Sequence, residues 1–202
     1  MLALHTFAPD DSFVGAACAL DHRVVCWAQA TCTGPWLTFA RAVTFLGSGW
    51  MVLPVVLASL APGRFARLGV TARALLLVTG VTSGLVALLK MLVQRPRPFR
   101  AYSDVMALVA APSDYSLPSG HAAGAFVVAT FITCALAYSG ARARHVVLCG
   151  AALGLVAAMV AASRVVLGVH FPIDVTLGAL FGMACGVVGA REAGRRSLIR
   201  RH

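Results

Sequence analysis

Three short polar clusters interrupt an otherwise apolar sequence, and each holds residues that can bind or transfer a phosphoryl group. They lie at 90–98, 118–121 and 163–174, next to long apolar runs. Ionisable residues at the edge of a membrane-spanning segment are costly and usually serve a function. We therefore treat the three clusters together as a candidate site.

The first cluster, KMLVQRPRP, is basic and rigid. Lys90 is the only lysine in the chain. Arg95 and Arg97 each precede a proline, which disfavours the helical conformation and predicts a helix end near Gln94. An ammonium group and a planar guanidinium together suit the oxygens of a phosphate. Taken alone, Lys90 could simply extend towards the membrane interface.

The second cluster, PSGH, resembles the start of a helix. Ser119 suits the N-cap position, and Gly120 lets a ligand approach the backbone closely. The free N–H groups and the positive end of the helix dipole form an anion site at such a start. His121 would then lie beside the anion. A structural role as a helix cap would also explain Ser119 and Gly120.

The third cluster pairs a histidine with a carboxylate. Arg164 ends an apolar run, and His170 precedes Pro172, a favourable first residue of a helix. Asp174 could accept a proton from one imidazole nitrogen and leave the other as a nucleophile. A lone histidine or aspartate at a helix start is more often a cap, but three coinciding clusters favour a joint role.

The elements that must position these clusters are membrane helices. Hydrophobic residues make up 59% of the 202 residues and charged residues 12%, far from a soluble composition. Short connections without alternating patterns exclude a barrel, so we predict one all-α domain, 1–202, as a polytopic helical bundle. Glycine pairs such as Gly178/Gly182 and Gly80/Gly84 favour close packing. Five runs are long enough to span a membrane: 37–61, 69–93, 121–139, 146–163 and 173–190.

The arginines predict the orientation of the bundle. They follow the first, third and fifth runs: Arg64, Arg67, Arg73, Arg142, Arg144, Arg191, Arg195, Arg196, Arg200 and Arg201. By the positive-inside rule those regions, including the C-terminus, are cytoplasmic. The connections 94–120 and 164–172 are then external. Because the net charge of +10 is spread over loops, it reports topology and gives no reason to expect a nucleic-acid partner.

The N-terminal segment 13–33 is ambiguous. Asp21, His22 and Arg23 stand amid apolar residues, which is typical of a helix lying in the membrane interface. If this segment spans instead, the number of spans becomes six. The six cysteines show no CxxC spacing and are expected to be ordinary apolar side chains, with pairing among Cys18, Cys26 and Cys32 as the alternative.

In order and spacing, the clusters resemble the three signature motifs of the type 2 phosphatidic acid phosphatase superfamily. The matching residues are Lys90, Arg97, Pro98, Pro118, Ser119, Gly120, His121, Ser163, Arg164, His170 and Asp174. The segment 41–51 is similar to a less stringent stretch that precedes these motifs in small bacterial members. The resemblance implies a haloperoxidase-like helical core in the bacterial inner membrane, with a site on the periplasmic or exterior face.

The resemblance also implies roles. His170 would be the nucleophile that forms a phosphohistidine, Asp174 its orienting partner, and His121 the acid that protonates the leaving oxygen. The phosphoryl oxygens would be bound by Lys90, Arg97, Ser119, Gly120 and Arg164. No metal or other cofactor is expected, because cations and backbone N–H groups can stabilise the charge of phosphoryl transfer.

A site at the membrane edge suits a lipid phosphate, and small members of the superfamily resemble undecaprenyl pyrophosphate phosphatases. Further headgroup contacts are expected from the 99–117 loop and the residues before it: Arg95, Arg100, Tyr102, Asp104, Asp114 and Tyr115. Alternative activities are phosphatidylglycerophosphate, phosphatidic acid or lipid A phosphatase, or lipid phosphotransferase. A non-catalytic transporter or structural subunit is the alternative of another class. The sequence predicts no oligomeric state.

Overall fold

The structure is a computed structural model that describes residues 13–48, 57, 60 and 66–199, and every regular element in these ranges is a helix. In chain order these are α1 (Phe13–Thr31), α2 (Pro35–Thr44), the 3-10 helix η1 (Phe45–Gly47), α4 (Ala66–Val93), α5 (Pro98–Ala101), α6 (Gly120–Tyr138), α7 (Ala143–Val166) and α8 (Pro172–Ile199). The all-α prediction is therefore confirmed for the described part of the chain.

Four of the described helices, α4, α6, α7 and α8, are long and apolar enough to cross a membrane. They match four of the predicted runs within a few residues, except that α8 continues beyond its run. The chain is thus a membrane protein. The fifth run, 37–61, falls partly outside the described residues, and its described start forms α2 and η1. The total of five or six spans stays a prediction.

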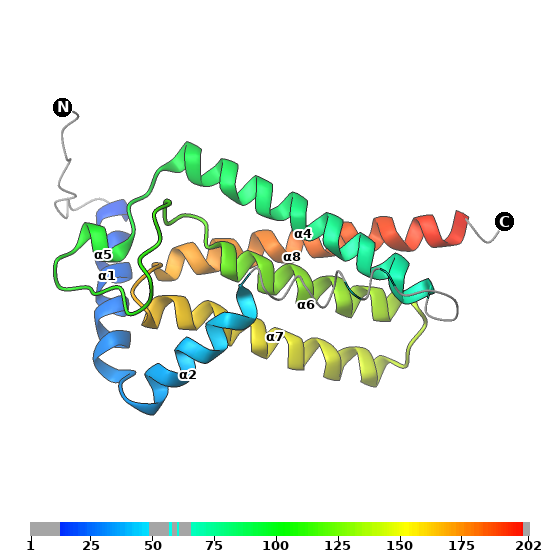
Figure 1. Ribbon diagram of the computed structural model, residues 1–202, viewed down its shortest axis with the longest axis horizontal. Helices are drawn as coiled ribbons and strands as arrows, with labels where there is room; N and C mark the ends of the chain where they lie inside the picture. Colours follow the sequence, from blue (N-terminus) through cyan, green and yellow to red (C-terminus); the bar gives the residue numbers. More distant parts are fainter. Residues whose placement is uncertain (1–12, 49–56, 58–59, 61–65, 200–202) are drawn as a thin grey trace.

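The central helix of the bundle is α6, which packs against α4, α7 and α8 (Figure 1). Its closest neighbour is α8, because glycines line the contact. A Cβ on Gly178 would lie 2.6 Å from the Ser119 carbonyl oxygen, and one on Gly186 would lie 2.8 Å from Thr130 Cβ. The glycine spacing on α8 therefore does allow close helix packing. The α4 pair does not, since a Cβ on Gly80 would meet nothing within 4 Å.

The helix ends near the polar clusters follow the predicted signals. Helix α4 stops at Val93, and Gln94 adopts the left-handed φ of 52° just before the Arg-Pro pairs. Ser119 caps α6 by accepting a hydrogen bond from the Ala122 N–H. Helix α8 begins at Pro172. These boundaries bring the three polar clusters to the same end of the bundle (Figure 1).

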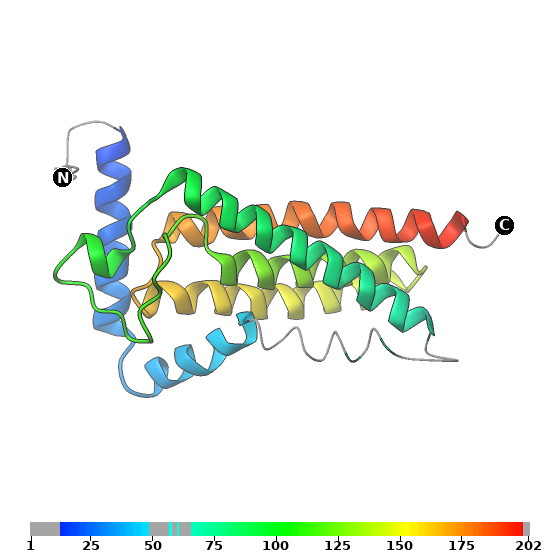
Figure 2. The ribbon, with the colours of Figure 1, turned by 45° about the horizontal axis from the view of Figure 1, so that its top comes forward.

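Helix α1 lies crosswise to the bundle at that end (Figures 1 and 2). Polar contacts attach it there: Asp21 accepts a hydrogen bond of 3.1 Å from the Ile173 N–H, and the Gln29 amide donates one of 2.7 Å to the Met106 carbonyl. A crosswise direction is the one expected of a helix that follows the membrane interface. Its position relative to the membrane stays a prediction.

We expect Gly186→Ala to destabilise the bundle by about 1–3 kcal/mol, because the added methyl group overpacks the α6–α8 contact. Gly80→Ala makes the same change in α4, where a Cβ meets open space, and should leave stability unchanged or raised. Thermal unfolding of the two purified variants in detergent measures the difference. Equal unfolding temperatures for the two variants would contradict close packing at Gly186.

Candidate active site

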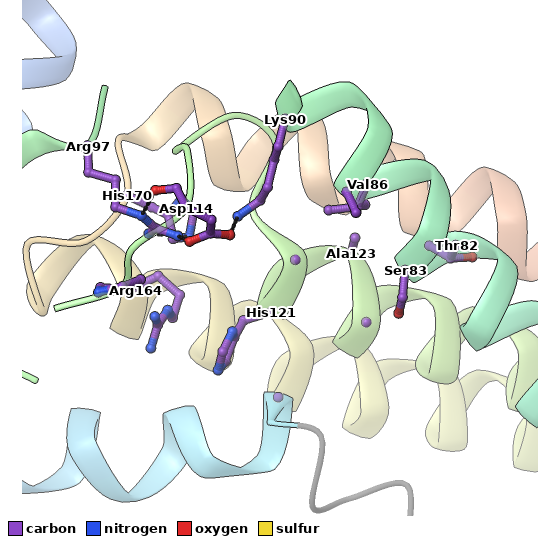
Figure 3. A pocket seen from close by; sticks show the side chains of 15 residues that line it. Thr82, Ser83, Val86, Lys90, Arg97, Asp114, His121, Ala123, Arg164 and His170 are labelled. Carbon is purple, nitrogen blue, oxygen red and sulfur yellow. Dashed lines mark hydrogen bonds and ion pairs between the residues drawn. The ribbon is translucent and has the colours of Figure 1, made fainter. Parts of the chain in front are cut away.

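A single cavity of about 370 Å³ brings together charged residues from all three polar clusters (Figure 3). It lies at the end of the bundle crossed by α1. Its charged and titratable lining residues are Lys90, Arg97, Asp114, His121, Arg164 and His170. Gly120, at the start of α6, also lines it. The two imidazoles that the sequence placed in separate motifs thus face one space.

Two of the three cations are held in fixed positions by hydrogen bonds. Arg97, only 2% exposed, donates to the Val169 carbonyl at 2.7 Å. Arg164 donates from Nη1 to the Thr44 hydroxyl at 2.8 Å. Arg164 Nε is buried and has no hydrogen-bond partner within the described chain. A buried N–H without a partner is costly, so this donor is available to an anionic ligand.

The segment 41–51, singled out in the sequence, contributes to the site through its described part. Thr44 is the hydrogen-bond partner of Arg164, and Gly47 lines the cavity. A Cβ on Gly47 would come within 3.2 Å of His121 Cδ2, so a glycine there leaves room for the imidazole. Residues 49–51 lie outside the described residues.

Among the residues that the structure describes, Asp114 is the one carboxylate that lines the cavity. Lys90 Nζ donates to its Oδ2 at 2.5 Å, and Arg97 Nη2 donates to its Oδ1. Partial burial acts to raise the pKa of Asp114, but the hydrogen bonds from Lys90 and Arg97 outweigh it and lower the pKa to about 2. An ionised carboxylate therefore lies between two cations that the motifs assign to phosphate. The sequence indicated Asp114 as a candidate headgroup contact in the 99–117 loop, but not its pairing with Lys90 and Arg97.

His170 is held as a neutral imidazole with a defined tautomer. Arg97 Nη1 lies 3.2 Å from its Nε2, and Asp174 Oδ2 lies 3.6 Å from its Nδ1. Because a guanidinium can only donate, Nε2 carries the lone pair and Nδ1 the proton. Burial lowers the pKa of His170 to about 4, although the carboxylate of Asp174 acts to raise it. At pH 7 the ring is uncharged.

Asp174 is completely buried and fully paired. Its Oδ1 accepts a hydrogen bond of 2.6 Å from Arg95 Nη1, and its Oδ2 accepts from the Ser116 hydroxyl and, at 2.8 Å, from the Phe171 N–H. Arg95 also donates to Asp21 of α1 at 2.7 Å. Sequence reasoning missed this role of Ser116 and Asp21. The isolated charge of Asp21 in an apolar helix was the only signal.

Several residues that the sequence predicted to contact the phosphate or the headgroup lie outside the cavity lining. The cavity lining does not include Ser119, Arg95, Arg100, Tyr102 or Tyr115. Arg95 points instead to Asp174, and Arg100 donates to the carbonyl of Pro112 at 2.9 Å. Ser119 donates its N–H to the Asp174 carbonyl at 3.0 Å, besides capping α6. These residues shape the surroundings of the cavity.

Comparisons with known proteins agree with this arrangement. The profile of the PAP2 superfamily matches residues 71–196. Decaprenylphosphoryl-5-phosphoribose phosphatase of Mycobacterium tuberculosis is 30% identical, over 82% of this chain and 85% of the relative. Phosphatidylglycerophosphatase B of Bacillus subtilis is 33% identical, over 74% of this chain and 71% of the relative.

Two solved structures are similar to this one. The transmembrane PAP2 type phosphatidylglycerolphosphate phosphatase from Bacillus subtilis superposes with a TM-score of 0.73 at 25% identity, covering 89% of this chain and 87% of that one. Aquifex aeolicus LpxE superposes with a TM-score of 0.68 at 28% identity, covering 85% of this chain and 95% of that one. The similarity extends over most of each chain.

We expect Arg95→Met to lower the free energy of unfolding by about 3 kcal/mol, because it leaves the buried Asp174 carboxylate without its cation. Arg100→Met removes an arginine from the same region, but one that is exposed and bonded to loop carbonyls; it should cost far less. Denaturant titration in detergent compares the two. A similar loss of unfolding free energy in both variants would show that the ion pair of Arg95 and Asp174 adds no more stability than an exposed arginine does.

Proposed function

The chain belongs to the PAP2 superfamily and is a membrane lipid phosphatase, and we propose that it hydrolyses a lipid phosphate monoester through a phosphohistidine intermediate. The observation that carries this proposal is the single cavity lined by two imidazoles and three cations. Positioning and charge stabilisation are most of what phosphoryl transfer requires. The two imidazoles and three cations that face the cavity support both needs.

In the first step, Nε2 of neutral His170 attacks phosphorus and the bond from phosphorus to the lipid oxygen breaks. His121 donates a proton to that oxygen, so the lipid leaves as an alcohol. Water then attacks the phosphohistidine, with His121 accepting its proton, and inorganic phosphate is released. The tautomer of His170, set between Arg97 and Asp174, supports its role as the nucleophile.

The negative charge that develops on the equatorial oxygens would be stabilised by Lys90, Arg97 and Arg164. The buried Nε of Arg164 supports this role because a phosphate oxygen would satisfy it. Gly120 would add a backbone N–H at the positive end of α6. Ser119 would act through the cap that holds this turn. No metal ion enters these steps.

The substrate must displace Asp114 from Lys90 and Arg97 before its phosphate can occupy the same position. The side chain of Asp114 is 52% exposed, and it belongs to the connection between α5 and α6, so it can turn away without disturbing the bundle. We infer that this carboxylate holds the cations in place in the absence of substrate and competes with weakly binding anions.

The rest of the cavity supports a lipid substrate. Away from the charged end it runs between α4 and α6, where its lining is small and largely apolar (Figure 3): Thr82, Ser83, Val86, Ala87, Ala123 and Gly124. A prenyl or acyl chain would find apolar contacts there while its phosphate reaches the charged end. A soluble phosphate ester would leave this surface unused.

Among lipid phosphates, a polyprenyl-linked monoester such as decaprenylphosphoryl-5-phosphoribose is our first candidate. It is supported by a relative that matches over most of both chains. Phosphatidylglycerophosphate is the second, supported by the Bacillus subtilis relatives. The hypothesis of undecaprenyl pyrophosphate came from the resemblance to small members of the superfamily. A diphosphate would use cations beyond those that hold one phosphate, but Arg95 and Arg100, the nearby candidates, do not line the cavity. This hypothesis therefore has less support, and stays open to the experiment below.

The charge distribution supports a site on the non-cytoplasmic side of a bacterial inner membrane. Arg142 and Arg144 lie at the end of the bundle opposite the cavity, where α7 begins and α8 ends (Figure 1). By the positive-inside rule that end, with the C-terminus, is cytoplasmic. A lipid phosphate in the outer leaflet would then reach the cavity from the membrane.

We expect the purified protein to release phosphate from lipid monoesters in the presence of EDTA, with His170→Ala reducing turnover by about 10⁴-fold or more. The panel is decaprenylphosphoryl-5-phosphoribose, phosphatidylglycerophosphate, phosphatidic acid, lipid A and undecaprenyl pyrophosphate. Preference for the last would overturn the monoester proposal. Unchanged turnover in the folded His170→Ala variant would overturn His170 as the nucleophile. Absence of phosphate release from every lipid of the panel would favour the non-catalytic alternative.

We also expect Asp114→Asn to tighten the binding of vanadate, a phosphate-like ion, by roughly tenfold. The substitution removes the negative charge that competes with vanadate for Lys90 and Arg97. Inhibition constants measured for the variant and for Ser113→Ala, an exposed neighbour in the same loop, provide the comparison. Weaker binding in Asp114→Asn would mean that the carboxylate supports the ligand-bound cations and does not compete with the ligand.

A further inference from the structure

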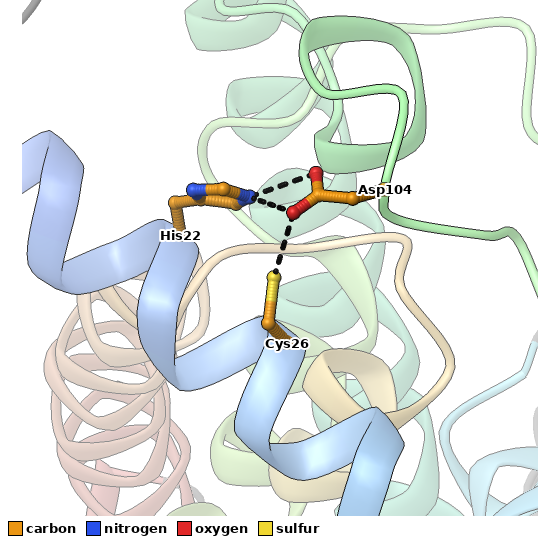
Figure 4. A group of neighbouring side chains, drawn as sticks. All are labelled: His22, Cys26 and Asp104. Carbon is orange, nitrogen blue, oxygen red and sulfur yellow. Dashed lines mark hydrogen bonds and ion pairs between the residues drawn. The ribbon is translucent and has the colours of Figure 1, made fainter.

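Outside the cavity, α1 and the loop after α5 bring together an imidazole, a thiol and a carboxylate (Figure 4). The donor atoms of His22, Cys26 and Asp104 all lie within 4.8 Å of one another. His22 Nε2 is 3.0 and 3.1 Å from the two carboxylate oxygens, and Cys26 Sγ is 3.5 Å from Oδ2. We propose that these three residues bind a Zn²⁺ ion.

The ligand set and its spacing suit this ion. Zn²⁺ prefers histidine nitrogen, cysteine sulfur and carboxylate oxygen, at about 2.0–2.3 Å in a tetrahedral arrangement. Tetrahedral bonds of that length place neighbouring ligand atoms roughly 3.3–3.8 Å apart. The distances from Asp104 to His22 and Cys26, 3.0–3.5 Å, are close to this range, and all three ligand atoms lie within 4.8 Å of one another. A thiolate and a carboxylate would neutralise the ion, and the exposed position of Asp104 leaves the fourth ligand position to water.

The fold also fixes the positions of two of the three proposed ligand side chains. His22 and Cys26 are four residues apart on α1, so both project from the same face of the helix. Tyr102 stacks on the His22 ring with centroids 3.8 Å apart and planes 7° from parallel, which fixes the direction of the imidazole. Two ligands therefore come from a rigid helix, and only Asp104 comes from a loop.

Such an ion would link two segments far apart in the sequence. It would fasten α1 to the 102–119 connection, which also carries Asp114 and Ser116. The proposed role is therefore structural, and it does not depend on the proposed phosphatase activity. The sequence predicted Cys26 to be an ordinary apolar side chain; its contact with a carboxylate indicates a polar role instead.

The test uses the full-length protein, purified in detergent without a polyhistidine tag. Titration with Co²⁺, a spectroscopic substitute for Zn²⁺, should give one equivalent of tight binding and a sulfur-to-cobalt charge-transfer band. Zn²⁺ should then displace the cobalt. Absence of the band, or binding without a defined stoichiometry, would overturn the proposal.

Variants identify the ligands. Cys26→Ser should abolish the band. His22→Ala and Asp104→Asn should each weaken Zn²⁺ binding by more than the 10–100-fold loss known for residues that only orient a metal ligand. Cys32→Ser, at the end of the same helix, is the matched control and should bind normally. Binding that survives Cys26→Ser would refute the site. If a variant fails to fold, alkylation of the unmodified protein decides: Zn²⁺ should protect Cys26 and leave Cys32 reactive.

Discussion

The completely buried carboxylate of Asp174 is the constraint on which the site depends. An ionised group at zero exposure is stable only when donors and a cation surround it, and here those partners come from different parts of the chain. Arg95 follows α4, Ser116 precedes α6, and the Phe171 N–H begins the turn into α8. Satisfying one carboxylate thus fixes the relative positions of three helix ends.

The same network orients His170, the proposed nucleophile. Asp174 lies beside Nδ1 of His170, and Arg97 contacts Nε2, so the ring has one orientation and one tautomer. Arg97 is in turn held by the Val169 carbonyl. The cations that line the cavity repel one another in a region of low dielectric constant, and the carboxylate of Asp114 offsets that repulsion. In the proposed mechanism a lipid phosphate can replace this carboxylate because it too is an anion.

Local sequence signals predicted the parts of this site that depend on neighbouring residues. The proline after Arg95, the serine before Gly120 and the proline after Phe171 each marked a helix end within one or two residues. The three motifs then identified Lys90, Arg97, His121, Arg164 and His170, which the fold gathers in one cavity. Short-range steric and capping rules are sufficient for the helix ends, whereas the choice of site residues also relied on the resemblance of the three motifs to those of a known family.

Contacts between distant segments could not be predicted in this way. Thr44 and Arg164 are 120 residues apart, and Asp21 and Arg95 are 74 apart. Arg95 illustrates the reason. Its sequence context resembles that of Arg97, but after a turn of two Arg-Pro pairs the two side chains leave in different directions. Which arginine faces the cavity depends on the hydrogen-bond partners of the two side chains. Those partners are known only from the tertiary structure.

The contacts within the bundle and the contacts that attach α1 also differ in their surroundings. Between α6 and α8, where hydrocarbon surrounds the helices, hydrophobicity cannot drive association, and close approach at Gly178 and Gly186 provides the contact. Helix α1 is attached by hydrogen bonds and an ion pair as well as by apolar packing of Val25 and Ala28. The end of the bundle that holds the cavity is therefore joined to α1 by polar and apolar contacts on top of close-packed helices, so changes to α1 should alter the site without unfolding the helices beneath it.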